Sequence, residues 1–429
     1  MSKKANGELH RAKTAEIVIV GAGPSGCMAA VSAAREGRNV LLLDANDKIC
    51  RKVYATGNGR CNLTNLHMTM DCYHTGGGAS LSAFFSRFSE KDLMRFWESQ
   101  GVFLHDRQGY VYPRTDQAAT IAEGFEKILR ALPVTIELGK RVVLVRRSER
   151  KGASHFQIET SDGSSYMAES VILAGGGMAG PQYGCGEAIY RIASSMGHTV
   201  VKPLPALVPL LSDDRNLKAS AGVRCDAAIT LLVNDQSVCS ERGELQMTEQ
   251  GISGIPVFQL SAIAARTLAQ GTAVTASIDF APDFDEKAWE KELARRLSEN
   301  KNCMLSVYFL GLVNRKILDL VLKRRGMQAE MKASRLSQEA LRGIMEDLRA
   351  FPIAIVGTGT FKQAQVTSGG VPLEEMDENL QSVRTPGLFM AGELVDVDGI
   401  CGGYNLQWAM TSGWIAGKGA AKATQGSVQ

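Results

Sequence analysis

The sequence predicts an α/β fold, and three observations lead to this prediction. Within the first fifty residues, an apolar β-branched run is followed by a glycine-rich turn and then by a helical pattern. A second apolar run, again followed by a glycine and an acid, lies near the other end of the chain. Between these regions, short strand-like runs give way to charged amphipathic helices. We therefore expect one α/β domain assembled from both chain ends, with two inserted segments.

The first fifty residues contain the elements of a nucleotide-binding unit in order. They are a strand at Ile17–Val20, a turn of Gly21, Ala22, Gly23, Pro24, Ser25 and Gly26, a helix at Cys27–Glu36 closed by Gly37, and a strand at Val40–Leu43 that ends at Asp44. Gly21 permits the tight turn, Gly23 lets a pyrophosphate approach the backbone, and Gly26 lets the helix lie close to the sheet. The helix N-terminus then offers unpaired N–H groups and a positive dipole end to the phosphates.

Asp44 completes this pattern, because it lies about twenty residues after the turn, where a carboxylate can accept the ribose hydroxyls. Strand, turn, helix and acid together predict a Rossmann-like unit that binds a dinucleotide. The alternative is a glycine-rich turn in an ordinary α/β domain.

Near the other end, the run from Thr385 to Glu393 has the pattern of a turn, a short apolar strand, small residues and an acid. A loop then leads to Gly402 and Gly403, and a helical pattern follows at Tyr404–Ala416. The simplest alternative is a strand, a loop and a helix joined by a glycine hinge. That alternative does not account for the residues that this region combines, which are Asp396, Asp398, Gly402, Gly403, Tyr404 and Asn405.

Within the first part of the chain, a helix is expected at Leu81–Gln100, with an aromatic stripe that we interpret as core packing. Strands are expected at Val142–Arg146, Phe156–Thr160 and Ser170–Leu173. The last of these leads into Ala174, Gly175 and Gly176. Because this segment lacks a second complete Gly-x-Gly-x-x-Gly with a following acid, no dedicated Rossmann domain for NAD(P)H is predicted.

The pattern divides the chain into four stretches. Residues 1–202 form the first part of the nucleotide-binding domain, 203–281 a β-rich insert, 282–355 a helical insert, and 356–429 the second part of the domain. The strands expected in the β-rich insert include Ala227–Val233 and Ala273–Phe280, and the helices expected after it are Glu286–Leu297, Leu305–Lys323 and Ser337–Arg349.

Composition limits the classes of partner. A chain of 429 residues is long enough for two or three domains, and 45% hydrophobic with 22% charged residues is typical of a soluble globular protein. The net charge of +3 gives no global field that would attract nucleic acid or an anionic membrane, and no uninterrupted apolar run is long enough to span a bilayer. We expect a small-molecule substrate, without a nucleic-acid or membrane partner. The sequence predicts no oligomeric state.

Residues 1–15 are polar and charged, so they are expected to form a tail and not a secretory signal. The nine cysteines form no Cys-x-x-Cys pair, which favours reduced thiols in a cytoplasm. The six histidines form no metal-binding motif, so no metal site is predicted. There is no Gly-x-Ser-x-Gly elbow and no cysteine pair after the first glycine turn, so we expect the chemistry to come from a bound cofactor.

Several sequence blocks show that the chain resembles the YhiN/BaiN-type FAD-dependent oxidoreductases, a group with aminoacetone-oxidase-like and bile-acid-reductase-like members. The blocks are Gly21–Asp44, Arg51-Lys52 with Thr56–Asn65, Gly109–Arg114, Leu173–Gly176, Gly197-His198, Pro205–Leu210, Gly251–Pro256, Val366–Val371, Gly392-Glu393 and Gly399–Trp408. The Gly-Asn-Gly-Arg-Cys-Asn and Gly-Gly-Tyr-Asn-Leu-Gln-Trp blocks are the most specific. The chain departs from the group at Gly177–Gly186, which is not rich in Ser, Thr and Asp, so the role of this loop stays open.

The resemblance implies FAD as the cofactor, held in a domain of the two-dinucleotide-fold type with a β-barrel-like insert and a small helical insert. It implies that Glu393 meets the ribityl or phosphate region and that the segment opened by Arg51 and Lys52 follows the FAD. A helix start at Tyr404 would direct N–H groups at the pyrimidine edge of the flavin. The predicted cofactor-binding residues are Gly21, Gly23, Pro24, Ser25, Gly26, Asp44, Arg51, Lys52, Gly57, Gly59, Arg60, Asn62, Ala174, Gly175, Gly176, Gly392, Glu393, Gly402, Gly403, Tyr404 and Asn405.

The predicted catalytic residues are Tyr404, Arg60 and Asn405. Tyr404 is the candidate proton donor because a phenol keeps its proton at neutral pH. Arg60 can make a bidentate contact with a carbonyl or carboxylate. For Arg51 and Lys52, the alternative is that they are surface charges. Cys61 is interpreted as a small buried thiol in preference to a redox residue. Tyr110, Tyr112 and Arg114 either line a substrate pocket or pack against the next helix.

Three functions stay open on the sequence alone. The favoured one is an NAD(P)H-linked reductase that passes hydride from flavin N5 to an electron-poor carbon, such as that of a conjugated enone in a steroid-like or bile-acid-like molecule. The second is an oxidase of a small amine or aminoketone that produces hydrogen peroxide. The third is a flavin-binding sensor with little turnover, in which the helical insert docks a partner.

Overall fold

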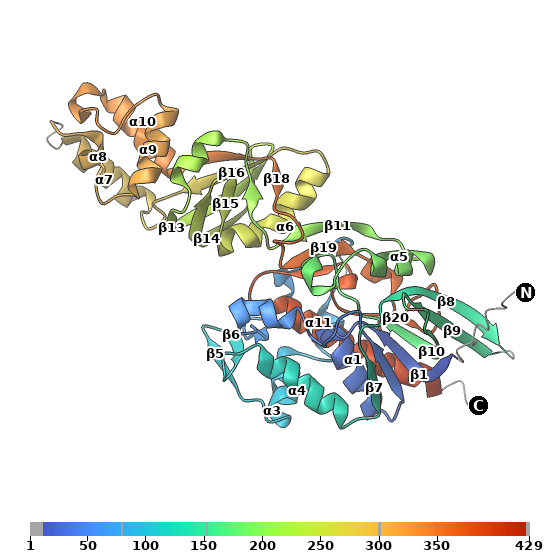
Figure 1. Cartoon of the computed structure of the whole chain (residues 1–429). Coiled ribbons are helices and arrows are strands. Elements are labelled where there is room, and N and C mark those ends of the chain that lie inside the picture. Colours follow the sequence, from blue (N-terminus) through green and yellow to red (C-terminus); the bar gives the residue numbers. More distant parts are fainter. Residues whose placement is uncertain (1–11, 79, 151–152, 299–301, 426–429) are drawn as a thin grey trace, which may run out of the picture. The chain divides into compact units, whose positions relative to one another are not determined.

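The computed structural model describes residues 12–78, 80–150, 153–298 and 302–425 (Figure 1). The chain forms two compact units, each with its own hydrophobic core. Unit 1 is Met1–Pro203 together with Val366–Gln429, and unit 2 is Leu204–Gln365. Among the described helices, none combines the length and the apolar character that crossing a membrane requires.

Unit 1 is built around a mixed sheet with the strand order β7-β2-β1-β10-β9-β8, and β20 pairs with the last residues of β10. The strands are β1 (Lys13–Val20), β2 (Val40–Leu43), β7 (Val134–Glu137), β8 (Val142–Arg150), β9 (Ala153–Thr160), β10 (Ser165–Leu173) and β20 (Leu388–Met390). β7, β2, β1, β10 and β20 are parallel, whereas β8, β9 and β10 form an antiparallel meander. The carboxyl ends of the parallel strands therefore meet at one edge, where open α/β sheets bind their ligands.

β1 confirms the first expected strand but begins earlier, at Lys13. Its last four residues, Ile17–Val20, are buried, as expected for a parallel strand covered on both faces. The expected polar tail at residues 1–15 is therefore wrong for residues 13–15, and residues 1–11 of it lie outside the described residues. The nine cysteines, all within the described ranges, form no disulfide bond.

The helices of unit 1 begin and end at recognisable signals. They are α1 (Pro24–Arg35), α2 (Ser82–Phe85), α3 (Glu90–Ser99), α4 (Ala119–Arg130), α5 (Ala188–Ser195) and α11 (Tyr404–Gln425). α1 starts with Pro24 in its first turn, and Gly37, with a φ of 82°, follows its end. The single helix expected at Leu81–Gln100 is two helices, because Ser89 forms a capping box with Asp92 and starts α3 anew.

α11 continues to Gln425 instead of ending at Ala416, and it packs along α1. The contact is close because it is made through glycines: a Cβ on Gly413 would lie 2.2 Å from the Ser25 carbonyl oxygen. A Cβ on Gly417 would lie 2.3 Å from the carbonyl oxygen of Ala29. The C-terminal helix therefore covers the helix that follows the glycine turn.

Smaller sheets complete unit 1. They are β3 (Thr64–Asn65) with β6 (Tyr110–Pro113) and β5 (Leu104–Arg107), β4 (Tyr73–Thr75) with β21 (Val397–Gly399), and β11 (Val201–Ala206) with β19 (Val366–Gly370). The chain leaves unit 1 after β11 begins and returns to it with β19. Residues from both chain ends thus pair directly in the sheet of β4 and β21.

Unit 2 contains a sheet with the order β17-β16-β13-β14-β15-β12-β18. The strands are β12 (Leu210–Leu211), β13 (Arg224–Val233), β14 (Gln236–Thr248), β15 (Gly251–Ser253), β16 (Val274–Asp279), β17 (Phe351–Ile355) and β18 (Gly357–Thr358), and α6 (Ile255–Ala269) packs on β14. The two edge strands, β17 and β18, are consecutive in the chain, with Val356 alone between them. The sheet therefore curls so that its two edges come close together. This arrangement is barrel-like.

The boundaries of the inserts differ from those expected. β17 and β18 follow the helical stretch, yet they complete the β-rich sheet, and residues 356–365 lie in unit 2 instead of the nucleotide-binding domain. The reason is that this β-rich sheet uses strands from both sides of the helical segment. Short strands such as Gly357–Thr358 carry too weak a pattern to be assigned to a sheet from sequence.

The helical segment of unit 2 contains α7 (Glu286–Ser298), α8 (Leu305–Tyr308), α9 (Arg315–Arg324) and α10 (Gln338–Arg349). Figure 1 shows these helices grouped at one end of unit 2, beyond the sheet. The helix expected at Leu305–Lys323 is two helices, because Gly311 has a φ of 80° and Asn314 caps α9.

Candidate cofactor site

The glycine-rich turn after β1 places its three glycines as the sequence predicted. A Cβ on Gly21 would lie 2.4 Å from the Ala174 carbonyl oxygen, and one on Gly26 would lie 1.8 Å from the Gly21 carbonyl oxygen. A Cβ on Gly23 would meet nothing within 4 Å, so space is open on that side of the turn. Gly21 and Gly26 are therefore needed for packing, while Gly23 leaves room beside the first N–H groups of α1.

Asp44 lies beside this turn, with its carboxylate turned toward it. Its Oδ2 accepts a hydrogen bond from the Ala22 N–H at 2.6 Å, and its Oδ1 accepts from the Asn46 N–H at 2.7 Å. Asn46 in turn accepts from Arg51 Nη1 at 3.1 Å. Asp44 and Arg51 are thus brought to the same end of the site, with Asn46 between them.

Lys52 points to a different part of the site from Arg51. Its Nζ lies 2.8 Å from Glu393 Oε2, which joins a residue near the start of the chain to one near its end. Burial lowers the pKa of Lys52, but the Glu393 carboxylate outweighs this effect and leaves the pKa above its ordinary value. The Lys52 ammonium is therefore charged at neutral pH.

Thr367 connects the Lys52–Glu393 ion pair to the loop at Gly177–Gly186, whose role the sequence left open. Its hydroxyl donates to Glu393 Oε1 at 2.7 Å and accepts from the N–H groups of Met178 and Ala179. A Cβ on Gly177 would lie 2.4 Å from the Thr367 hydroxyl and 2.6 Å from Glu393 Oε1. The loop after Ala174, Gly175 and Gly176 is thereby folded against the Lys52–Glu393 pair.

Gly392 brings the end of β20 to the first turn of α1. It has a φ of 75°, and a Cβ there would lie 2.6 Å from the Ser25 hydroxyl. Trp408 Nε1 donates to the Gly392 carbonyl oxygen at 3.2 Å. Because Trp408 belongs to the second turn of α11, these contacts join the starts of both helices to the residue before Glu393.

The segment of Gly57, Gly59, Arg60 and Asn62 forms an exposed turn at residues 57–60, and the chain becomes more buried from Cys61 onward. Gly57 and Gly59 have positive φ values of 56° and 84°. Arg60 is exposed, while Asn62 Oδ1 is buried and has no hydrogen-bond partner among the described residues. Burial raises the pKa of Cys61 to about 12, which agrees with its interpretation as a small buried thiol.

Gly402 and Gly403 lie against the strands that follow this segment. A Cβ on Gly402 would lie 2.7 Å from the ring of Tyr110, and one on Gly403 would lie 2.6 Å from the Thr64 carbonyl oxygen. Asn65 Nδ2 donates to the Gly402 carbonyl oxygen at 3.0 Å. The Tyr110 ring therefore packs against the glycine pair.

Tyr404 and Asn405, at the start of α11, make contacts with the backbone. The Tyr404 hydroxyl donates to the His67 carbonyl oxygen at 3.2 Å, and burial raises its pKa. This hydrogen bond uses the proton that the prediction assigned to catalysis. Asn405 Nδ2 donates to the Gly399 carbonyl oxygen at 2.7 Å, and its Oδ1 accepts from the Gly399 N–H at 2.8 Å. Asn405 therefore holds the loop that precedes the glycine pair.

The residues present fit FAD on three observations. The open side of Gly23 adjoins a helix N-terminus, which is an anion-binding arrangement. The carboxylate of Asp44 lies at the end of β2, beside the same turn. The buried Asn62 Oδ1 lacks a described partner, as expected of an atom that contacts a bound group.

Some residues of this site were not predicted as site residues. Thr367, Asn46 and Asn65 make the hydrogen bonds that hold Glu393, Asp44 and Gly402. Thr367 and Asn65 belong to the blocks that carry the resemblance, so a signal for them existed. Asn46 had no such signal, since it lies in an ordinary polar turn after β2.

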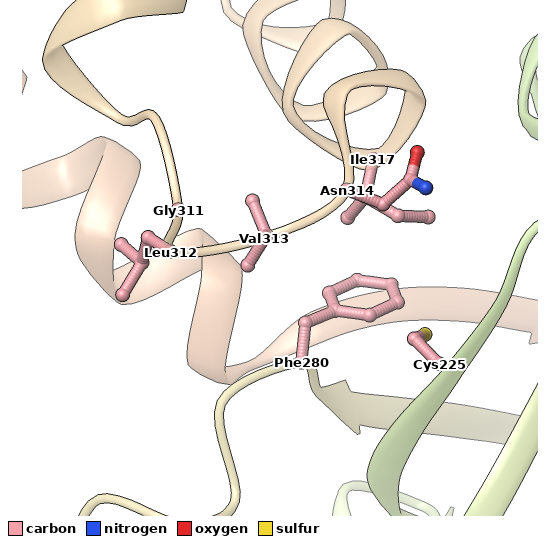
Figure 2. A pocket seen from close by; sticks show the side chains of 7 residues that line it. All are labelled: Cys225, Phe280, Gly311, Leu312, Val313, Asn314 and Ile317. Atoms are coloured by element: carbon pink, nitrogen blue, oxygen red, sulfur yellow. The ribbon is translucent and has the colours of Figure 1, made fainter.

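A cavity of about 260 Å³ lies in unit 2. Figure 2 shows the Phe280 ring between the loop at 311–314 and Cys225 of β13. The lining residues are Cys225, Phe280, Gly311, Leu312, Val313, Asn314 and Ile317. The lining is mainly apolar, and it contains no member of the predicted FAD site.

Comparisons with known proteins agree with this geometry. A family model described as the HI0933-like protein Rossmann domain matches residues 15–419. The chain is 37% identical over 409 residues to the 3-dehydro-bile acid delta(4,6)-reductase of Clostridium scindens, covering 95% of this chain and 99% of that protein. It is 29% identical over 408 residues to the ribosomal RNA dihydrouridine synthase of Escherichia coli, covering 93% of this chain and 96% of that protein.

Among solved structures, the chain is similar to the 3-ketosteroid delta1-dehydrogenase of Sterolibacterium denitrificans in complex with 1,4-androstadiene-3,17-dione. The TM-score is 0.51 with 12% sequence identity, over 96% of this chain and 100% of that one. At this identity, the similarity concerns the fold alone.

Proposed function

The chain belongs to the HI0933-like family and is an FAD-dependent oxidoreductase, and from this premise we propose that it reduces a conjugated enone of the steroid or bile-acid class. The observation that carries the proposal is the 37% identity, over almost the full length of both chains, to a reductase named for a 3-dehydro-bile acid. The sequence analysis also favoured a reductase over an amine oxidase.

In this proposal, the chain's residues hold FAD along one path. The N–H groups at the start of α1 bind the pyrophosphate on the open side of Gly23, and Asp44 binds the adenosine ribose. Glu393, fixed by Lys52 and Thr367, meets the ribityl chain. When bound, FAD supplies the hydride that an electron-poor carbon accepts.

The flavin ring itself is assigned to two segments. The Gly57–Asn62 turn and the loop at Gly402 and Gly403 would hold it. Glycines at both places allow the backbone to approach a flat ring, and the first N–H groups of α11 favour negative charge on its pyrimidine edge. Arg60 is exposed in this turn and is proposed to bind a carbonyl or carboxylate of the substrate.

NAD(P)H is proposed as the electron donor. Because the sequence lacks a second complete dinucleotide motif, the nicotinamide is expected to approach the flavin transiently, without a domain of its own. The substrate is proposed to be a small molecule, and the chain is proposed to act in the cytoplasm.

An anaerobic spectroscopic titration tests this function. The purified holoprotein is mixed with NADH or NADPH, and the loss of flavin absorbance is followed. 3-Oxo-4-cholenoic acid, a bile-acid-like enone, is then added to the reduced protein. The proposal expects one nicotinamide to bleach the flavin and the enone to restore its colour. If both nicotinamides leave the flavin oxidised while aminoacetone bleaches it and oxygen then yields peroxide, the chain is an oxidase instead.

A second candidate substrate is a uridine of RNA, favoured by the similarity to two ribosomal RNA dihydrouridine synthases, from Haemophilus influenzae and Escherichia coli. Formation of dihydrouridine also reduces a carbon–carbon double bond conjugated to a carbonyl. The same titration decides, with ribosomal RNA transcribed without modifications as the acceptor.

The charges of the helical segment of unit 2 favour the small molecule. Its arginines are largely engaged by carboxylates, which leaves less positive charge for phosphates. The pairs are Arg295 and Arg296 with Glu292, Arg315 with Asp319 and Glu330, Arg325 with Asp347, Arg342 with Glu290, and Arg349 with Asp279. We therefore rank the enone before RNA.

A further inference from the structure

A histidine and an aspartate from opposite ends of the chain face each other where β4 and β21 pair. His74 lies directly across from Asp398 in the register, and His74 Nδ1 is 3.5 Å from Asp398 Oδ2. The Asp398 side chain is 2% exposed, whereas that of His74 is 28% exposed. The sequence predicted neither residue for the site, because 324 positions, counted from residue 74 to residue 398, separate them.

The two nitrogens of the His74 ring have different surroundings. Nδ1 is buried and makes no hydrogen bond with any described residue, although it faces the carboxylate. The exposure of the side chain therefore comes from its other atoms. A carboxylate beside one ring nitrogen fixes the orientation of an imidazole and leaves the second nitrogen to exchange a proton.

Along the chain, Asp398 lies between residues assigned to FAD. Asp398 follows Glu393 and precedes Gly402, and the next residue, Gly399, is the one held by Asn405. On the other strand, the neighbour of His74 is Tyr73, whose hydroxyl donates to the Tyr404 carbonyl oxygen at 2.9 Å. Both strands of the pair are thus tied directly to the first turn of α11.

We propose that His74, positioned by Asp398, delivers the proton that completes reduction of the enone. This inference rests on the proposed function. Hydride reaches the carbon β to the carbonyl, the electron pair of the double bond moves onto the carbonyl oxygen, and the α-carbon must then gain a proton. The N–H bond at His74 Nε2 breaks, a C–H bond forms at the α-carbon, and water returns a proton to Nε2. Tyr404 cannot take this role without breaking its hydrogen bond to His67.

A single-turnover experiment separates proton delivery from hydride supply. The holoprotein is reduced anaerobically, and reoxidation of the flavin is followed after mixing with 3-oxo-4-cholenoic acid or with ferricyanide, which accepts electrons without a proton on carbon. His74→Gln should slow reoxidation by the enone about 100-fold and leave reoxidation by ferricyanide unchanged. Asp398→Asn should slow the enone reaction about 10-fold. His155→Gln, on the meander strand β9, should react as the natural protein does, and Tyr404→Phe, at the rival donor, is measured in the same way.

A binding measurement tests the same assignment without turnover. In the oxidised holoprotein labelled with ¹⁵N-histidine, the His74 signals are identified by their loss in His74→Gln. Addition of the saturated ketone 3-oxo-5β-cholanoic acid should shift these signals and leave those of His155 in place.

The outcomes distinguish the two ideas. If the natural protein passes no electrons to the enone, the proposed function fails. If it does, but His74→Gln matches it in the enone reaction, the role of His74 is overturned and the function stands. A variant that slows both acceptors equally has lost flavin geometry, and this result also contradicts proton delivery by His74. If Tyr404→Phe shows the selective loss instead, the sequence-based choice of donor is restored.

Discussion

Two glycines of one turn, three residues apart, have opposite requirements. Gly26 has no space for a side chain, since a Cβ would overlap the Gly21 carbonyl oxygen at 1.8 Å. Gly23 has open space and an ordinary extended conformation, with φ −73° and ψ −178°. Gly26 is therefore required by the fold, whereas Gly23 is assigned to the ligand.

This contrast predicts a split between stability and FAD affinity. Gly23→Ala should change the thermal midpoint of the flavin-free protein by less than about 2 °C, because no contact is lost. The same variant should bind FAD at least about tenfold more weakly, since the methyl group occupies the pyrophosphate's side of the turn. Gly26→Ala should lose at least about 2 kcal/mol of unfolding free energy, because the helix must move. Thermal denaturation and flavin fluorescence titration measure both quantities. Equal FAD affinity of Gly23→Ala and the natural protein would contradict the assignment.

Glu375 is the centre of a buried polar cluster in unit 1. His198 Nδ1 lies 2.7 Å from its Oε2, and Arg384 Nη2 donates to its Oε1 at 2.8 Å. Burial raises the pKa of Glu375, but hydrogen bonds from Thr199, Arg384 and His198 outweigh this and bring the pKa to about 2. Because the folded pKa lies below the ordinary value of 4.5, the stability it contributes is complete above about pH 4.5 and is lost as the pH falls toward 2.

Glu375→Gln should therefore destabilise the protein by on the order of 3 kcal/mol at pH 7. The difference from the natural protein should shrink steadily between pH 4.5 and 2. Burial also lowers the pKa of His198, so acid destabilises the natural protein at this cluster in the same direction. Urea denaturation across this pH range measures the effect, with Glu374→Gln, at the exposed neighbouring position, as the control. A difference that stays constant with pH would rule out Glu375 ionisation as its source.

At this scale, the sequence predicted the glycines correctly because their motif reports local backbone geometry. It did not identify His74 and Asp398 as a pair, because their contact depends on the pairing of distant segments. It also did not single out Thr367, although this residue lies in a block that carries the resemblance. Tyr404 shows the same limit: its place at a helix start was confirmed, but its hydrogen bond to His67 joins segments that are far apart in the sequence, and no local pattern reports it.

Among the elements, the contact between α1 and α11 controls the site. Ser25 and Ala29 of α1 face Gly413 and Gly417 of α11 at distances that admit no Cβ, and Ser32 Oγ donates to the Trp414 carbonyl oxygen at 2.7 Å. Small residues four apart on both helices let the two backbones touch. The start of each helix is assigned to FAD, so their packing sets the distance between the phosphate and ring ends of the site.

Gly417→Leu should force the helices apart. Because the contact is backbone to backbone, the variant should lose roughly 3 kcal/mol or more of unfolding free energy and should bind FAD poorly. Lys422→Leu, an exposed position on the same helix, should change stability by less than about 0.5 kcal/mol. Denaturant unfolding of both variants, followed by circular dichroism, provides the comparison. A Gly417→Leu variant as stable as Lys422→Leu would mean that the two helices are not tightly packed in solution.

Sequence periodicity predicted the existence of most elements, and it failed where they end or break. The helix expected at Leu81–Gln100 is interrupted by the Ser89 cap, and the one at Leu305–Lys323 by Gly311 and Asn314. In both cases the apolar spacing continues across the break, so the pattern does not register it. α11 continues past Ala416 because its glycines, which weaken a helix in isolation, are stabilised here by packing on α1.

For the whole molecule, two separate hydrophobic cores imply two cooperative units. The residues assigned to FAD all belong to unit 1. The predicted fold class and family are confirmed, because both follow from motifs at the chain ends that form unit 1. The division of the middle of the chain was harder to predict, since the barrel-like sheet is closed by strands from beyond the helical segment.

Differential scanning calorimetry of the flavin-free protein should therefore show two transitions. Excess FAD should raise the midpoint of one transition alone, by several degrees, because a ligand stabilises only the unit that binds it. Gly23→Ala should remove this shift at the same FAD concentration. Equal shifts of both transitions would show that the cofactor is shared between the units.

The order in which the chain is synthesised adds a consequence to the packing of α11 on α1. While the protein is being made, the nucleotide turn and α1 leave the ribosome long before β20 and α11. Until those two elements have been made, the small-residue face of α1 has no partner, and β10 lacks β20 along its final residues. The nascent polypeptide is therefore expected to take up its prosthetic group only after α11 has emerged, and a truncation that removes α11 should leave a flavin-free product.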